Sequence, residues 1–460
     1  MTLSEGLYFY FGQYVEAPLV AAFGDMEPFT VGLIFSAVMV LLVSIGVRVF
    51  LAAAVVGLLG LVALIGWEAG TGMAGTVPHS KISSFTLSVL PMFILIGYLA
   101  FHAGLTKAVF DAARKWCSQA PGGLAIATVF ATAGFAAVSG ASTATAAVFS
   151  RVAIPEMLKH GYDRRLAAGV VAAGGTLASL IPPSAILVIY AIIVEESVGQ
   201  LLLAGFIPGI ISAVIYAALI SARVMLNPKL APPTQRYPWG ERFRALPGTT
   251  PIVAVIVIIF TAIYGGWATP TEAGALGAFV VLVIALLKGM KYSSFKNALF
   301  ETAKLTAMIF SIIWGVLIFV RFLGFAGLPD AFATFVGSLD MPPVLIVIMI
   351  LLVYMVLGMF MDAIGMLLLT LPVVYPAIVG LGYDPIWFGI IVVKMAEICL
   401  VTPPIGLNCF VVNGVRPDIP LNDVFRGIGP FFVAAIATVG LFIAVPEIVT
   451  FLPRLMLQKL

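Results

Sequence analysis

Four short segments place polar groups inside otherwise apolar stretches of the sequence. Two are candidate hairpin tips, at 139–145 and 358–362, and two are double prolines, at 182–183 and 403–404. A double proline interrupts a helix and frees backbone carbonyls. Hydroxyl, amide, carboxylate and carbonyl oxygens are ligands of small hard cations, and the N–H groups that begin a half-helix favour a carboxylate. This combination predicts two cation sites with an organic anion between them.

The candidate residues fall into two groups. The residues expected to meet the anion are Ser139, Ser142, Ser184 and Arg321. The residues expected to hold the cations are Gly140, Thr143, Thr145, Pro182, Gly358, Asp362, Thr402, Pro403 and Asn408. Each hydroxyl could instead bond to the preceding helical turn, which is the commoner role of Ser and Thr in membrane helices. The proline breaks could likewise be purely structural.

Three charged residues at or near membrane depth have alternative roles. Asp362 either lines the second cation site or caps the helix that closes its hairpin. Arg321 either pairs its guanidinium with a substrate carboxylate or extends to the membrane interface. Glu272 has a local explanation, because Thr269 lies three residues before it and the two form a predicted capping box.

The remaining charges in the apolar segments are expected to be structural. Lys394 and Glu397 are spaced i, i+3 on one helix face, which favours a local pair over a proton relay. Asp163 and Asp384 each follow a Gly-Tyr turn and open a helix, where aspartate is a preferred N-cap.

The composition excludes a soluble protein. Hydrophobic residues make up 62% of the 460 residues and charged residues only 10%, whereas a soluble domain is about 45–50% apolar and about 25% charged. Apolar runs long enough to cross a bilayer recur between Thr30 and Leu452. We therefore expect an all-α polytopic membrane protein with about ten transmembrane spans, two re-entrant hairpins and two discontinuous helices.

Several functional classes are excluded. A net charge of +3 argues against nucleic acid as a partner. Cys117, Cys399 and Cys409 are too scattered for a disulfide framework or a transition-metal site. No nucleotide-binding loop or hydrolase motif is visible, so we expect no enzymatic activity and no organic cofactor. The first basic residue is Arg48, which argues against a cleavable signal peptide.

The basic residues predict the orientation in the membrane. They are concentrated in the loop at 223–244, which we place in the cytoplasm. Following the apolar runs in both directions puts the basic corner at 151–165 on the same side. The N-terminus and the C-terminus are then both expected outside.

An internal repeat relates two parts of the chain. The pattern P-x5-G-Y-D-x18-P-P begins at Pro155 and again at Pro376, an offset of 376 − 155 = 221 residues. Basic residues flank the first copy and not the second, which places the copies on opposite sides of the membrane. Such inverted repeats are typical of secondary transporters, although channels can also carry them.

The repeat suggests five segments along the chain. They are N-terminal scaffold spans at 1–87, a first repeat with hairpin and broken helix at 88–222, a cytoplasmic loop with central scaffold spans at 223–311, a second repeat at 312–450, and a tail at 451–460.

Four motifs resemble a known family. The hydroxyl-rich tip at 139–145, the break at 180–184, the Ala-Thr-Pro-Thr-Glu-Ala segment at 268–273 and the break at 401–408 are similar to motifs of the large membrane subunit of tripartite ATP-independent periplasmic (TRAP) transporters. The sequence departs from the family pattern at Lys394, which is unusual so deep in an apolar segment.

The resemblance implies an elevator-type Na⁺ symporter in a bacterial inner membrane, with both termini periplasmic. It implies two partners, a small four-helix membrane subunit and a periplasmic substrate-binding protein, besides the surrounding lipids. The transported solute would be an organic acid such as a C4-dicarboxylate, another carboxylate or a sugar acid, and the two bound cations would be Na⁺. The alternatives are a stand-alone Na⁺- or H⁺-coupled dicarboxylate symporter of related fold, or an anion channel.

Overall fold

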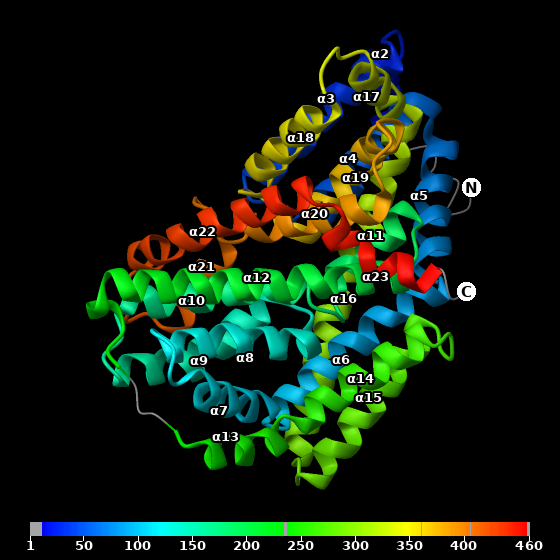
Figure 1. The fold of residues 1–460 in the computed structure, drawn as a ribbon. Helices are drawn as coiled ribbons and strands as arrows, with labels where there is room; N and C mark the ends of the chain where they lie inside the picture. The colour runs from blue at the N-terminus through cyan, green and yellow to red at the C-terminus, as the bar shows by residue number, and fades with distance from the viewer. Residues whose placement is uncertain (1–11, 234–236, 360, 405, 458–460) are drawn as a thin grey trace. The chain divides into compact units, whose positions relative to one another are not determined.

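The computed structural model describes residues 12–233, 237–359, 361–404 and 406–457 (Figure 1). This described part contains helices and turns and no β-strand, which confirms the predicted all-α class. Six of its helices are long and apolar enough to cross a membrane, or eight if each of two bent helix pairs is one span. Four shorter apolar helices accompany them. The polytopic architecture is confirmed, while the expected total of about ten spans stays a prediction.

The chain divides into two compact units, each formed by separate stretches of sequence. The first unit comprises Met1–Leu87, Ala307–Val353 and Phe360–Pro385. The second unit comprises Ser88–Thr306, Tyr354–Met359 and Ile386–Leu460. The five linear segments expected from the sequence stay predictions.

The first unit is built from the N-terminal helices and from part of the second repeat. Its helices are α2 (Ala17–Phe23), α3 (Pro28–Ser44), α4 (Val49–Ile65), α5 (Trp67–Ile82), α17 (Leu328–Gly337) and α19 (Ala363–Gly380), with most of α18 (Pro343–Gly358) and the C-terminal part of α16 (Tyr292–Phe325). The short helix η1 (Gly12–Glu16) precedes them.

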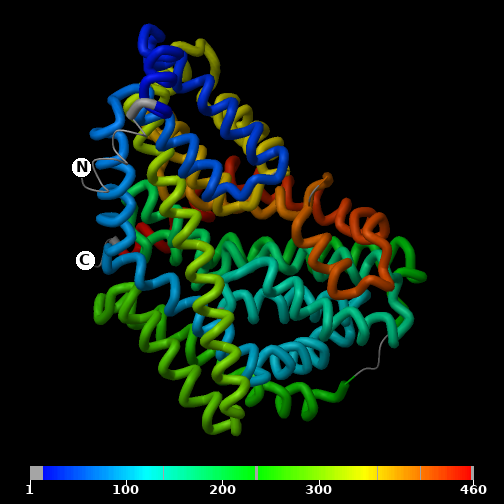
Figure 2. Tube along the Cα trace, turned by 180° about the vertical axis from the view of Figure 1, so that it is seen from behind, coloured from blue at the N-terminus to red at the C-terminus, as the bar shows by residue number. Residues whose placement is uncertain are grey.

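The second unit contains the first repeat and the discontinuous helices. Its helices are α6 (Val89–His102), α7 (Leu105–Cys117), α8 (Gly123–Ser139), α9 (Ser142–Lys159), α10 (Arg164–Gly175), α11 (Ala185–Val194), α12 (Val198–Leu226), α13 (Trp239–Ala245), α14 (Thr250–Tyr264), α15 (Pro270–Leu287), α20 (Pro385–Cys399), α21 (Leu407–Val415), α22 (Leu421–Ala444) and α23 (Glu447–Leu457). Its short helical turns are η3 (Thr176–Ser179), η4 (Pro228–Leu230) and η5 (Leu246–Gly248), while η2 (Phe85–Ser88) has all but its last residue in the first unit. In both views α12 runs between α8 and α22 (Figures 1 and 2).

The order of the elements agrees with the internal repeat. Seven elements, α6 to α12, are followed by seven others, α16 to α22, with a break after α10 and after α20. Gly104 and Gly327 adopt the same left-handed conformation before α7 and α17. Each break contains a cis Pro–Pro peptide bond, at 182–183 and at 403–404. The opposite membrane orientation of the two copies stays a prediction.

Two contacts join segments that the charge pattern places on one side of the membrane. The indole of Trp116, at the end of α7, donates a hydrogen bond to the carbonyl of Arg242 in α13 over 3.1 Å. The backbone N–H of Asp163 donates to the carbonyl of Leu230 over 2.9 Å. The Gly-Tyr-Asp corner and the end of α7 therefore both meet the basic loop. Which side of the membrane this is stays a prediction.

Two predicted helix starts are confirmed. Oδ1 of Asp163 accepts the backbone N–H groups of Arg165 and Leu166 at 2.9 and 3.0 Å, as an N-cap does. Thr269 and Glu272 form the expected capping box, with N–H to carboxylate and N–H to hydroxyl distances of 2.7 and 3.3 Å.

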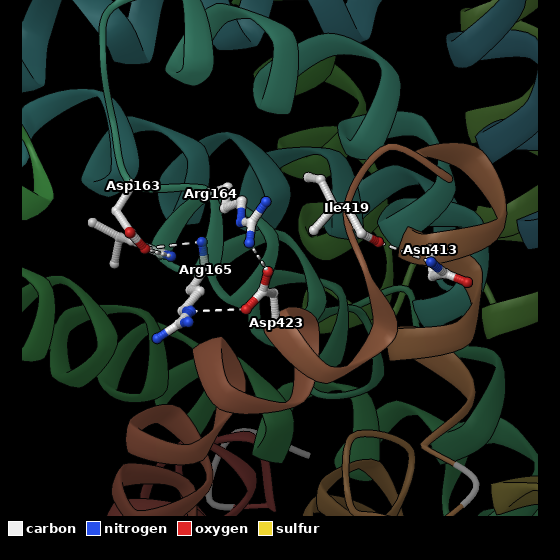
Figure 3. Close-up of polar contacts among 7 residues, drawn as sticks. Asp163, Arg164, Arg165, Asn413, Ile419 and Asp423 are labelled. Atoms are coloured by element: carbon white, nitrogen blue, oxygen red, sulfur yellow. Dashed lines mark hydrogen bonds and ion pairs between the residues drawn. The ribbon is translucent and has the colours of Figure 1, made fainter.

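Within the second unit, the backbones of helices α10 and α22 are in contact where the two helices cross. A Cβ placed on Gly427 would lie 2.0 Å from the carbonyl oxygen of Arg165, so a larger residue does not fit. One turn away, the buried carboxylate of Asp423 forms ion pairs with Arg164 at 2.6 Å and with Arg165 at 2.8 Å (Figure 3). These contacts attach the start of the first discontinuous helix to α22.

Candidate functional site

The first hairpin tip is a tight turn between α8 and α9. Gly140 ends α8 with φ +59°, a left-handed conformation that favours glycine, and Ala141 is extended. The hydroxyls of Ser139 and Thr145 lie 2.8 Å apart across the turn. Thr145 also donates to the carbonyl of Ala141 at 2.9 Å. The tip therefore holds two buried hydroxyls in fixed positions.

The tip lies directly against the first proline break. A Cβ on Gly140 would be 2.7 Å from the carbonyl oxygen of Pro183, so only glycine allows the backbones to approach this closely. After the break, Ser184 caps α11 by accepting the N–H of Leu187 at 3.4 Å. The structure thus brings together five predicted site residues, namely Ser139, Gly140, Thr145, Pro182 and Ser184. We call this region, with Ser142, the first hairpin locus.

A residue that follows the second break also reaches this locus. The side-chain nitrogen of Asn408 donates to the carbonyl of Ala172 at 3.4 Å. A Cβ on Gly175 would lie 3.2 Å from that nitrogen and 3.0 Å from the carbonyl oxygen of Ser142. Asn408 is fully buried, and within the described residues its Oδ1 has no hydrogen-bond partner. Elements of both repeats therefore meet here, whereas the sequence suggested one cation site per repeat.

Glu397 is a member of the locus that no sequence pattern indicated. Both carboxylate oxygens of this buried residue lie 2.7 Å from the hydroxyl of Ser142. The predicted pairing with Lys394 is not a direct ion pair, because within the described residues no salt bridge joins the two side chains and the Lys394 Nζ has no hydrogen-bond partner. That ammonium instead lies 5.4 Å from the centroid of the Tyr216 ring. Packing against α9 and α12 thus supplies other neighbours for both charges.

The other predicted residues lie apart from this arrangement or keep local roles. Thr143 is exposed on the first turn of α9. The Thr402 hydroxyl donates to the carbonyl of Ile398 at 2.7 Å, the packing role noted above, and Pro403 is exposed. The residue Gly358 ends α18 and is buried.

Two predicted site residues belong to the first unit. Asp362 accepts the N–H of Gly365 at 3.1 Å and caps α19, which is the structural alternative for this carboxylate. Arg321 is exposed on α16. A cation-binding role for Asp362 and a substrate-binding role for Arg321 stay predictions.

The donor set of the locus suits a small hard cation. It consists of hydroxyl, carbonyl, amide and carboxylate oxygens, which are the ligands that such ions prefer. Among the described residues, no group of three or more His, Cys, Asp or Glu side chains could hold a metal ion. Asn408 Oδ1 accepts no hydrogen bond from the part of the chain that the structure describes, and such a buried oxygen is costly unless a ligand bonds to it.

The fold is similar to that of two solved transporter structures. The YdaH transporter of Alcanivorax borkumensis aligns with a TM-score of 0.53 and 14% identity, over 91% of this chain and 98% of that chain. MtrF of Neisseria gonorrhoeae, described as illuminating a class of antimetabolite efflux pumps, aligns with a TM-score of 0.51 and 13% identity, over 93% and 96%. The apolar spans indicate a multi-pass membrane protein, and the structural similarity shows that its fold also occurs in transporters.

Residues 33–448 match the family described as "Tripartite ATP-independent periplasmic transporter, DctM component". The chain belongs to this family, as the four motifs indicated. Members of the family are the large membrane permeases of TRAP transporters, so the chain is a transport protein and not an enzyme.

Individual relatives carry different substrate names. The C4-dicarboxylate TRAP transporter large permease protein DctM of Pseudomonas aeruginosa is 35% identical over 80% of this chain and 86% of its own length. The sialic acid permease SiaM of Vibrio cholerae is 29% identical over 84% and 91%. The ectoine permease TeaC of Halomonas elongata is 31% identical over 83% and 87%.

Proposed function

We propose that the chain is the large subunit of a Na⁺-coupled symporter that moves an organic acid across a bacterial inner membrane. In this proposal a periplasmic substrate-binding protein delivers the acid, and a small four-helix membrane subunit completes the complex. The membership in the TRAP family supports the transport role. The relatives named for C4-dicarboxylates and sialic acid support an acidic solute. Both termini would face the periplasm.

The observation that carries the cation half of the proposal is the unpaired Oδ1 of Asn408. It is fully buried near the Ser142 carbonyl, at a tip that also holds the Thr145 hydroxyl. A monovalent cation at this locus would supply the positive partner that this oxygen lacks among the described residues. Asn408, Ser142 and Thr145 would hold it. Two such ions are proposed, the second with the Thr402 oxygens among its ligands.

The same locus offers groups for the acid. Helices α9 and α11 both begin there, at Ser142 and after Ser184, so their N-terminal N–H groups and partial positive charge favour a carboxylate. A bound Na⁺ would increase this preference, because it adds charge beside the carboxylate. Mutual attraction of this kind couples the binding of ion and substrate. An elevator movement would expose the locus alternately to the two sides.

Na⁺ binding is tested by the thermal melting of the purified chain in NaCl, KCl and choline chloride at equal ionic strength. A ligand at about 100 Kd stabilises the folded state by about 2.7 kcal/mol per site. We expect a saturable, Na⁺-specific rise in melting temperature that the variant Asn408→Ala reduces. The matched control is Asn413→Ala in the same helix, since Asn413 donates to the carbonyl of Ile419 at 2.8 Å and lies outside the locus (Figure 3).

Three results would count against the proposal. Equal melting in the three salts would argue that the chain has no Na⁺ site. An unchanged Na⁺ effect in Asn408→Ala would remove this residue from the site. Uptake by reconstituted transporter that does not require the binding protein would favour a stand-alone symporter.

A further inference from the structure

The helix α20 carries two charges in the interior of the second unit. Lys394 is 0% and Glu397 1% exposed, one turn apart. At the offset of 221 residues, the equivalent positions of the first repeat are Ala173 and Thr176, which carry no charge. The second repeat therefore carries a positive and a negative charge where its counterpart has none.

The Lys394 ammonium lacks the partners that a buried charge requires. Within the described residues its Nζ has no hydrogen-bond acceptor. It lies 5.4 Å from the ring centroid of Tyr216, whose hydroxyl is 3.5 Å from that of Thr176. An aromatic face attracts a cation but does not replace a counter-charge. A negative group nearby must compensate this ammonium.

Among the described residues, the Glu397 carboxylate in turn has too few hydrogen-bond donors and no positive charge in contact with it. One hydroxyl, that of Ser142, lies 2.7 Å from both oxygens and can donate only one proton. Lys394, which is fully buried and lies one turn away on the same helix, is the nearest cation along the chain. A buried carboxylate without a counter-charge costs several kcal/mol. The two residues are therefore each other's compensation, although they do not touch.

We infer that the Lys394 ammonium neutralises the Glu397 carboxylate. It thereby takes the place of a Na⁺ ion that the carboxylate would otherwise attract to the first hairpin tip. The chain then needs no ion from solution to neutralise this carboxylate. Since Glu397 contacts Ser142, and the Ser142 carbonyl lies near Asn408, removing the ammonium would leave an anionic, oxygen-lined position. Na⁺ would bind there in addition to the ion at Asn408.

A double-mutant cycle of the full-length chain tests this inference by thermal melting. The variants are Lys394→Met, Glu397→Gln and the double variant, melted in choline chloride and in NaCl. In choline we expect each single variant to melt below the double variant by about 3 °C or more, because each leaves one charge uncompensated. In NaCl we expect Lys394→Met alone to gain an extra saturable stabilisation. The control is Lys304→Met, which removes an exposed lysine of α16.

Several outcomes would overturn the inference. One is a double variant that melts no higher than the less stable single variant, which would mean that the two charges do not compensate each other. Another is a Na⁺ effect in Lys394→Met no larger than in the wild type. If Lys394→Met cannot be purified in choline, the comparison of Glu397→Gln with the double variant decides alone. A failure of Na⁺ to stabilise the wild type would overturn the proposed Na⁺ coupling and leave the cycle valid.

Discussion

The contact between the first hairpin tip and the proline break can be tested by adding one methyl group. Gly140→Ala places a Cβ 2.7 Å from the Pro183 carbonyl oxygen, closer than real Cβ contacts allow. The left-handed backbone costs alanine about 1 kcal/mol. The overlap with a backbone atom that cannot rotate away adds about 1–3 kcal/mol. We expect a total destabilisation of about 2–4 kcal/mol, with the tip displaced from the break.

A matched control separates the two costs. Gly104 has φ +72°, and a Cβ there would meet no atom within 4 Å. Gly104→Ala should therefore lose only about 1 kcal/mol, from the backbone conformation. Thermal melting measures both, and Na⁺-dependent stabilisation should decrease in Gly140→Ala only. Equal losses in stability, or an unchanged Na⁺ effect in Gly140→Ala, would refute the idea that the tip–break contact builds the locus.

Two further predictions concern the rest of the second unit. Gly427→Ala should lower the melting temperature strongly because its Cβ would overlap a backbone carbonyl at 2.0 Å, whereas Gly429→Ala in the same helix meets nothing within 4 Å and should have little effect. The hydrogen bond from Arg416 lowers the pKa of Asp418 below its ordinary value of 3.8. A lowered carboxyl pKa stabilises the folded state above that ordinary value, and the contribution is lost as the pH falls. Melting of Asp418→Asn should therefore depend less on pH below about 4 than melting of the wild type, and identical profiles would contradict this.

Patterns that depend on neighbouring residues were predictable from the sequence. The turn at Gly161 to Asp163 and its copy 221 residues later gave the repeat, and the elements recur in that order. The caps at Asp163 and Thr269 also follow from local spacing, because the bonded atoms lie within three residues. The hydroxyl tip and the first break, which the sequence indicated, lie against each other in the structure.

Contacts between distant segments were not predictable in the same way. Ser142 and Glu397 are 255 residues apart, and no periodicity links them. The spacing of Lys394 and Glu397 suggested a local pair because it considers one helix alone. The packing of α9 and α12 against α20 gave the two charges different neighbours, Ser142 and Tyr216. The neighbours of Lys394 and Glu397 therefore depend on contacts between distant segments, which the spacing along one helix does not reveal.

The central claim, Na⁺-coupled transport of a carboxylate, is tested most directly by uptake into proteoliposomes. The vesicles would contain this chain with its small membrane subunit, and the assay would supply the binding protein with radiolabelled succinate or sialic acid. We predict saturable accumulation that requires both the binding protein and an inward Na⁺ gradient, and that an equal K⁺ gradient does not replace. Accumulation that is equal in Na⁺ and K⁺ would contradict the account.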